Sequence, residues 1–77
     1  MILNVKYFGL IAELTTREEE VLEFSGSTIF DFLEVLNAKY PELMNTNFQV
    51  AQEREIVSKE TQISGKEIAL LPPFSGG

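Results

Sequence analysis

The chain has 77 residues, 44% of them hydrophobic, and a formal net charge of −6 at pH 7, which is typical of one small globular domain. It contains neither cysteine nor histidine, which excludes disulfides, thiol nucleophiles, Cys/His zinc sites and imidazole bases. The negative charge disfavours nucleic acid and anionic membranes as partners and suits a basic protein surface.

Residues 1–8 predict a half-buried strand, because Leu3, Val5 and Tyr7 alternate with mostly polar neighbours. Phe8 falls on the opposite face of this strand, where an apolar ring is out of pattern. We therefore expect Phe8 to be exposed.

The next segments predict a short helical turn and a second strand. Residues 9–17 are compatible with one helical turn. Residues 19–24 alternate again, with Leu22 and Phe24 facing inward. The acidic run at residues 18–20 is interpreted as the solvated start of this strand, because consecutive strand residues point to opposite faces and do not form a metal site.

The clearest helix is predicted over residues 29–40, and Pro41 stops it. Thr28 is a good N-cap, and Asp31 completes a capping box near the positive end of the helix dipole. Apolar side chains at helical spacing predict one buried stripe, formed by Ile29, Phe32, Leu33, Leu36 and Tyr40.

The second half of the chain predicts three more strands. Residues 48–51 and 55–57 read as two short strands around a polar turn at residues 52–54, and residues 63–66 form another turn. Residues 67–71 predict the last strand. Its inward-facing residues are Ile68 and Leu70, and its outward-facing residues are Ala69 and Leu71.

This order of elements predicts the α+β fold class and, within it, a β-grasp (ubiquitin-like) fold with a mixed sheet of four to five strands and one main helix. The first and last strands then lie side by side and parallel in the middle of the sheet. We expect residues 1–71 to form a single β-grasp domain and residues 72–77 to form an extended, flexible C-terminal tail.

The tail is the most informative part of the chain. Pro72 and Pro73 lack backbone N–H groups, so the last strand cannot continue through them and the chain leaves in an extended path. Gly76 and Gly77 carry no side chains, so a terminal carboxylate on Gly77 can enter a narrow tunnel. A flexible end is the alternative, because Ser-Gly-Gly is also common in linkers.

An apolar patch is expected at the root of this tail. Phe8 and Leu71 face outward near the same end of two neighbouring strands, and Phe74 follows on the tail. Three converging apolar side chains beside a reactive terminus indicate a protein-binding surface. The predicted partner-binding residues are Phe8, Leu71, Pro72, Pro73, Phe74 and Ser75.

The sequence indicates a substrate of other enzymes rather than a catalyst. It lacks a phosphate-binding glycine loop, and its serines and threonines have no histidine to activate them. An ionised carboxylate is a poor electrophile, so reaction at Gly77 requires an ATP-derived acyl-adenylate. A sulfur donor would convert this adenylate to a thiocarboxylate, whereas an amine would give an isopeptide. No apolar run approaches the length of a membrane span, so we expect a cytoplasmic protein.

The tail at residues 72–77 resembles the Pro-Pro-x-x-Gly-Gly ending of MoaD, the small sulfur-carrier subunit of molybdopterin synthase, in the ubiquitin-like MoaD/ThiS family. Residues 64–69 resemble the Asp-Gly-Asp-Glu-Val-Ala turn and strand of that family, and residues 5–9 and 13–14 resemble its opening. The chain departs from the family pattern at Ala51-Gln52 and at Ser64-Gly65-Lys66.

The resemblance implies that an E1-like (MoeB-like) enzyme adenylates Gly77 with ATP and magnesium, and that a sulfur donor then forms the thiocarboxylate. The large (MoaE-like) subunit, in an expected heterotetramer, would pass this sulfur to a pyranopterin precursor. Phe8, Leu71 and Phe74 would anchor both partners. No permanently bound cofactor and no activity of the isolated chain are expected. The alternatives are a carrier for thiamine, cysteine or tungsten-cofactor synthesis and a ubiquitin-like binding module that is never thiolated.

Overall fold

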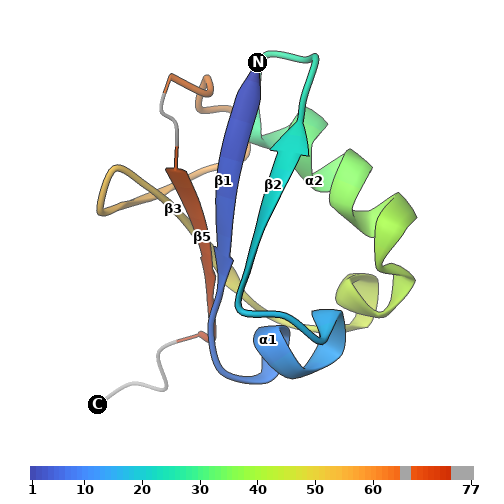
Figure 1. The fold of residues 1–77 in the computed structure, drawn as a ribbon. Coiled ribbons are helices and arrows are strands. Elements are labelled where there is room, and N and C mark those ends of the chain that lie inside the picture. The colour runs from blue at the N-terminus through green and yellow to red at the C-terminus, as the bar shows by residue number, and fades with distance from the viewer. Residues whose placement is uncertain (65–66, 74–77) are drawn as a thin grey trace.

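The computed structural model describes residues 1–64 and 67–73. Its elements, in chain order, are β1 (Ile2–Tyr7), α1 (Leu10–Thr15), β2 (Glu19–Glu23), α2 (Ile29–Lys39), the 3₁₀ helix η1 (Pro41–Asn45), β3 (Gln49–Gln52), β4 (Glu55–Val57) and β5 (Glu67–Leu71). The five strands form one mixed sheet in the order β2-β1-β5-β3-β4. Helix α2 packs against one face of the sheet (Figure 1). The predicted β-grasp fold is confirmed.

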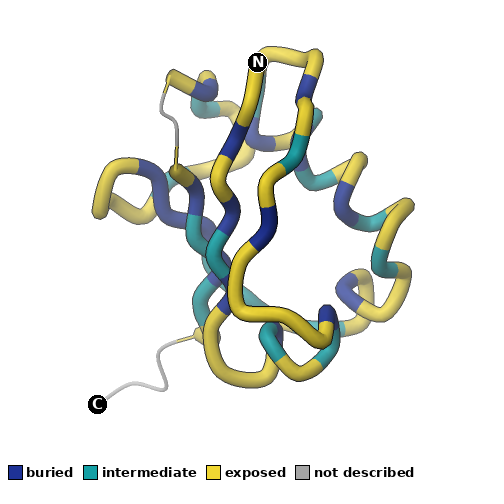
Figure 2. The backbone as a smooth tube through the Cα atoms, in the orientation of Figure 1, coloured by how far each residue is buried: buried dark blue, intermediate teal, exposed yellow. Residues whose placement is uncertain are grey.

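Strands β1 and β5 are parallel neighbours near the middle of the sheet, as predicted, with Tyr7 opposite Leu70. Buried and more exposed residues alternate along both strands (Figure 2). The predicted inward residues of the two strands are all buried: Leu3, Val5, Tyr7, Ile68 and Leu70. Because a strand alternates with a period of two, this register turns Phe8, Ala69 and Leu71 toward the face that α2 leaves open.

Helix α2 begins with the predicted capping box. The backbone N–H of Asp31 donates to the Thr28 hydroxyl, and the Thr28 N–H donates to the Asp31 carboxylate at 3.1 Å. Hydrogen bonds from the Ser27 and Thr28 backbone hold the pKa of Asp31 below its usual value. Of the predicted stripe, Ile29, Phe32 and Leu36 are fully buried, whereas Leu33 and Tyr40 are only partly buried.

Glu20 corrects the interpretation of the acidic run at residues 18–20. Glu18 and Glu19 are exposed, but Glu20 is only 7% exposed because it lies on the inward face of β2. Its carboxylate accepts hydrogen bonds from the hydroxyls of Tyr7 and Tyr40, both at 2.8 Å. Among the residues that the structure describes, Lys39 and, at 3.3 Å, Arg17 form ion pairs with it. The charge is thus buried with partners from β1, from the loop between α1 and β2, and from the C-terminal end of α2.

The pKa values of Glu20 and of its partner Tyr7 are shifted in opposite directions. Burial alone would raise the pKa of Glu20, but hydrogen bonds from Lys39, Tyr7 and Tyr40 together outweigh it and lower the pKa. Burial, followed by the hydrogen bond to Glu20, raises the pKa of the Tyr7 phenol. The fold therefore favours the ionised carboxylate and the neutral phenol.

Glu20→Gln tests this cluster. The folded-state pKa of Glu20 lies below the unfolded value of about 4.3, so the ionised side chain stabilises the fold above that pH. This stabilisation is lost as the pH falls through the folded-state pKa. We expect Glu20→Gln to lower the free energy of unfolding at pH 7 by about 1.5–3 kcal/mol, the range for hydrogen bonds to charged groups. Urea denaturation at about pH 3 should show a smaller difference from wild type. An equal difference at both pH values would contradict this role.

Candidate functional site

The candidate site lies where β1 and β5 end at the same edge of the sheet. The Phe8 N–H donates to the Leu70 carbonyl at 3.2 Å, which extends the β1–β5 ladder by one bond and holds Phe8 beside the end of β5. The Phe8 side chain is 44% exposed, and Leu71 is partly buried. Two of the three residues of the expected apolar patch are therefore together at the root of the tail.

These two side chains belong to a larger hollow on the open face of the sheet. Its apolar lining comes from four strands or their ends and consists of Phe8, Ala51, Ile56, Ala69 and Leu71. Charged side chains also border the hollow, among them Lys6 and Glu67, which form an ion pair at 3.2 Å. Because both partners of this pair are largely exposed, it contributes little to stability and remains free to exchange partners.

The extension of the hollow to β3 and β4 was missed in the sequence. Ala51 pairs with Ala69, and Ile56 pairs with Ala51 across the hairpin, so the same face continues to the edge of the sheet. Ile56 is 50% exposed and apolar. The only sequence signal was the apolar residue in the middle of a short strand, and its face could not be assigned without knowing the pairing.

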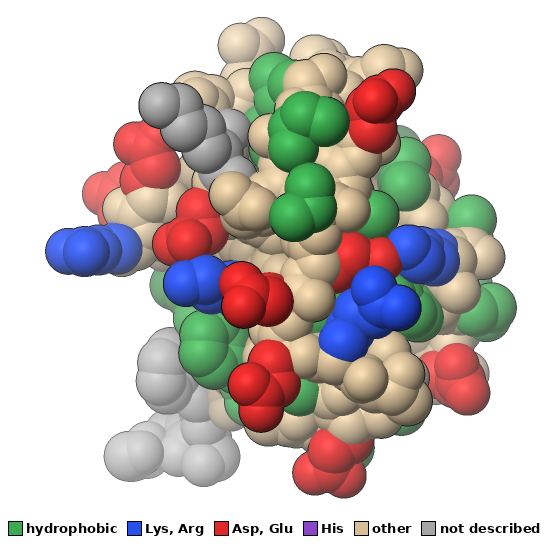
Figure 3. All heavy atoms as spheres, in the orientation of Figure 1, with side chains coloured by type: hydrophobic (Ala, Val, Ile, Leu, Met, Phe, Trp, Pro, Cys, Tyr) green, Lys and Arg blue, Asp and Glu red, His purple; other side chains and the backbone are tan. Residues whose placement is uncertain are grey.

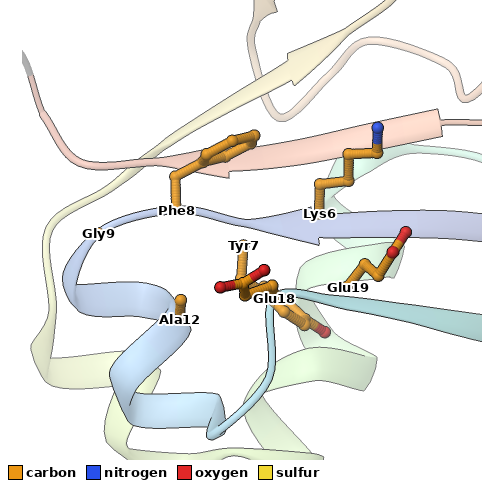
Figure 4. A pocket seen from close by; sticks show the side chains of 7 residues that line it. All are labelled: Lys6, Tyr7, Phe8, Gly9, Ala12, Glu18 and Glu19. Atoms are coloured by element: carbon orange, nitrogen blue, oxygen red, sulfur yellow. The ribbon is translucent and has the colours of Figure 1, made fainter.

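A second hollow lies on the other side of the end of β1, between α1 and the start of β2. Figure 4 shows Lys6 and Phe8 projecting from β1 to the same side, with Gly9 at the turn into α1 and Ala12 on the helix. Glu18 and Glu19 also line this hollow.

Acidic side chains are spread over the visible face of the molecule, with basic side chains beside several of them (Figure 3). This acidic border suits a basic partner surface.

Of the predicted tail residues, only the two prolines are described. Pro72 and Pro73 are exposed and follow β5 directly. Phe74, Ser75, Gly76 and Gly77 lie outside the described residues, so their predicted roles stay predictions.

The described residues at this edge of the sheet form a surface suited to binding. Among residues 1–64 and 67–73, no group of three or more acidic side chains is arranged to hold a metal ion. No helix in the same ranges is long and apolar enough to cross a membrane. The arrangement presents an apolar hollow with charged borders beside the start of an extended segment, which is suited to docking on a protein while the segment reaches further.

Comparisons with known proteins agree with the fold. The model of the ThiS family matches residues 5–77. The structure is similar to the small archaeal modifier protein SAMP1 of Haloferax volcanii, with 25% identity, a TM-score of 0.80 and 100% coverage of both chains. It is also similar to SAMP1 of Methanosarcina acetivorans, with 26% identity, a TM-score of 0.78, and coverage of 99% of this chain and 96% of that chain. A candidate molybdopterin converting factor subunit 1 of Pyrococcus furiosus shares the fold with a TM-score of 0.84 at 20% identity, covering 96% of this chain and 99% of that chain.

Proposed function

This chain belongs to the ThiS family, and we propose that it is a sulfur carrier whose C-terminal Gly77 is activated by a partner enzyme and converted to a thiocarboxylate. The observation that carries the proposal is the family match, which continues through the Pro-Pro-x-x-Gly-Gly segment to Gly77. The apolar hollow at the root of this segment supports it, because a carrier must dock on each partner while its terminus reaches the reacting groups.

The proposed chemistry has two steps. The Gly77 carboxylate attacks the α-phosphate of ATP, pyrophosphate leaves, and an acyl-adenylate forms. ATP and magnesium belong to the E1-like activating enzyme. A sulfur donor then delivers sulfur at the oxidation level of sulfide to the carbonyl carbon, the bond to AMP breaks, and the thiocarboxylate stays on Gly77. The chain itself supplies only the terminus and the docking surface.

Within this class we propose the molybdenum-cofactor branch. Its support is the resemblance of residues 72–77 to the ending of the small subunit of molybdopterin synthase. In this branch the thiocarboxylate enters the large, MoaE-like subunit of a cytoplasmic heterotetramer and gives its sulfur to a pyranopterin precursor. The test is reconstitution with a large subunit and the precursor. We expect the dithiolene to form only with the thiolated chain. Sulfur transfer in an assay of thiamine, cysteine or tungsten-cofactor synthesis, without dithiolene formation here, would assign the chain to that pathway instead.

A second candidate is a ubiquitin-like protein modifier. The similarity to two small archaeal modifier proteins at 25% and 26% identity over nearly the whole chain favours it. Both functions share adenylation of Gly77 and differ in the nucleophile, which is an amine for a modifier. Proteomic detection of peptides with the chain's C-terminus linked to lysine would support this candidate, and their absence beside abundant thiocarboxylate would exclude it.

Phe8→Lys and Leu71→Lys test the docking surface. Both side chains face the open side of the sheet, so we expect each variant to change the free energy of unfolding by less than about 1 kcal/mol. Binding to the activating enzyme should weaken by roughly 2 kcal/mol or more, as for central interface residues.

The matched control is Val21→Lys, on the same face but beside Asn4 and away from the tail. Val21 is 64% exposed, and its replacement should leave binding unchanged. Calorimetric titration of the three variants measures the difference. Equal loss of affinity in all three would show that the added charge, rather than the hollow, determines binding.

A further inference from the structure

Gly9 has a backbone conformation that other residues rarely adopt. It lies between β1 and α1 with φ 57° and ψ −133°. This combination is accessible to glycine but strained for residues with a Cβ atom. The conformation turns the chain from the end of β1 directly into α1, where the N–H of Ala12 donates to the Gly9 carbonyl at 3.0 Å.

The missing side chain of Gly9 also leaves room for the root of the tail. A Cβ atom built on Gly9 would lie 2.8 Å from Cγ of Pro72, closer than real Cβ contacts. The proline ring is rigid and cannot rotate away as a flexible side chain would. The Pro72 ring therefore occupies space that a side chain at position 9 would fill.

Gly9 is held in place from both sides along the chain. On one side, the hydrogen bond from the Phe8 N–H to the Leu70 carbonyl fixes the chain just before Gly9 against the end of β5. On the other side, α1 fixes Gly9 through its carbonyl. Pro72 has no N–H to continue the ladder, so packing against Gly9 takes over where the hydrogen bonds of β5 stop.

We propose that Gly9 is a positioning residue for the reacting tail: its bare Cα forms the seat for the Pro72 ring and thereby sets where the chain leaves the sheet. This inference rests on the proposed function, because a terminus that reacts while its domain is docked on an enzyme has to be aimed at the reacting groups. Where the chain leaves the sheet matters because a misplacement of about 1 Å at a reacting group can reduce a rate by up to a hundredfold.

The test is a double-mutant cycle of Gly9→Ala and Pro72→Ala. In the double variant the proline Cγ is gone, and the nearest remaining atom, Cβ of residue 72, lies at 3.9 Å from the new methyl group, which is an ordinary contact. The backbone strain of alanine at φ 57° is the same with and without Pro72. The cycle therefore separates the steric clash with the Pro72 ring from the backbone strain at residue 9.

The measured quantities are kcat and KM for thiocarboxylate formation by the activating enzyme, with the chain as the varied substrate. We expect Gly9→Ala to lower kcat by about tenfold or more, with KM within about twofold because the docking hollow is intact. Pro72→Ala removes the ring from this contact and should itself lower kcat, and Gly9→Ala should cause no further loss in the Pro72→Ala background. A double variant in which the two losses multiply would show that the residues act independently and would overturn the inference.

Two further measurements keep the inference testable. If Gly9→Ala fails to fold, the thermal midpoints of Gly9→Ala and of the double variant are compared. Pro72→Ala should restore folding if the clash with the proline ring is the cause. It should not restore folding if backbone strain at residue 9 is the only cause. If the wild-type chain never acquires sulfur, the proposed function fails, but the contact is still tested by NMR. Nuclear Overhauser effects between the Gly9 α-protons and the Pro72 ring are expected, and their absence would overturn the inference.

Discussion

Deletion of Gly77 is expected to abolish sulfur transfer and to leave the fold intact. The core extends from Leu3 to Leu70, so none of its members is removed. The terminal carbonyl moves back by about 3.5 Å, which takes it out of reach of the activating groups and should cost at least a hundredfold in rate. Circular dichroism and thermal unfolding measure the fold, and thiocarboxylate formation measures the function. Full activity of the shortened chain would contradict the role of Gly77.

Two substitutions in the tail test whether added side-chain bulk, rather than any change of side chain, blocks the reaction at Gly77. Gly76→Val keeps the length of the chain and adds a branched side chain, so it should be nearly as damaging if the tail enters a narrow channel. Ser75→Ala is the matched control, because it changes the side chain one position earlier without adding bulk. Activity of Gly76→Val at the level of Ser75→Ala would show that the channel is wide.

Leu70→Ala and Leu71→Ala should have opposite consequences although the residues are neighbours. Leu70 is fully buried in the core, so its truncation should lower the free energy of unfolding by about 2–5 kcal/mol. That is a large part of the roughly 5–15 kcal/mol by which a domain is stable. Leu71 faces the open hollow, and its truncation should cost less than about 1 kcal/mol of stability while weakening partner binding.

Urea denaturation and calorimetric binding of the two variants give this comparison directly. Similar losses of stability for Leu70→Ala and Leu71→Ala would mean that the last strand does not present alternate residues to the two faces. Preserved binding of Leu71→Ala would remove Leu71 from the docking surface.

The elements with strong local patterns were predictable from the sequence. The alternation in residues 1–8 and 67–71 predicted both central strands and their buried faces, because one face packs on α2 and the other is open. Thr28 and Asp31 predicted the start of α2 to the residue. The stop at Pro41 was also predicted, whereas the 3₁₀ helix η1, which begins at Pro41 and buries Leu43, was not.

The features that depend on distant partners were not predictable. Glu20 shares its face with Leu22 and Phe24, yet an acidic residue there reads as solvated until Tyr7 and Tyr40 are known to meet it. The β3–β4 turn contains Glu53 and Arg54 with φ of 53° and 68°. These residue types do not predict a positive φ, which Gly, Asn and Asp favour in such turns.

The candidate site was likewise predictable only where it depends on local patterns. The patch of Phe8 and Leu71 could be predicted because it follows from strand parity and one parallel pairing. The remaining lining residues, Ala51 and Ile56, depend on the register of β3 and β4. The seat of Pro72 on Gly9 depends on a contact between the two ends of the chain, and no local pattern encodes such a contact.

The most direct test of the account is the intact mass of the chain after incubation with ATP, magnesium, an activating enzyme and a sulfur donor. We expect the mass increase that replaces one oxygen by one sulfur, with fragmentation locating the sulfur on Gly77 and no increase when ATP is left out. An unchanged mass, under conditions in which the same enzyme adenylates the chain and thiolates its own carrier, would contradict it.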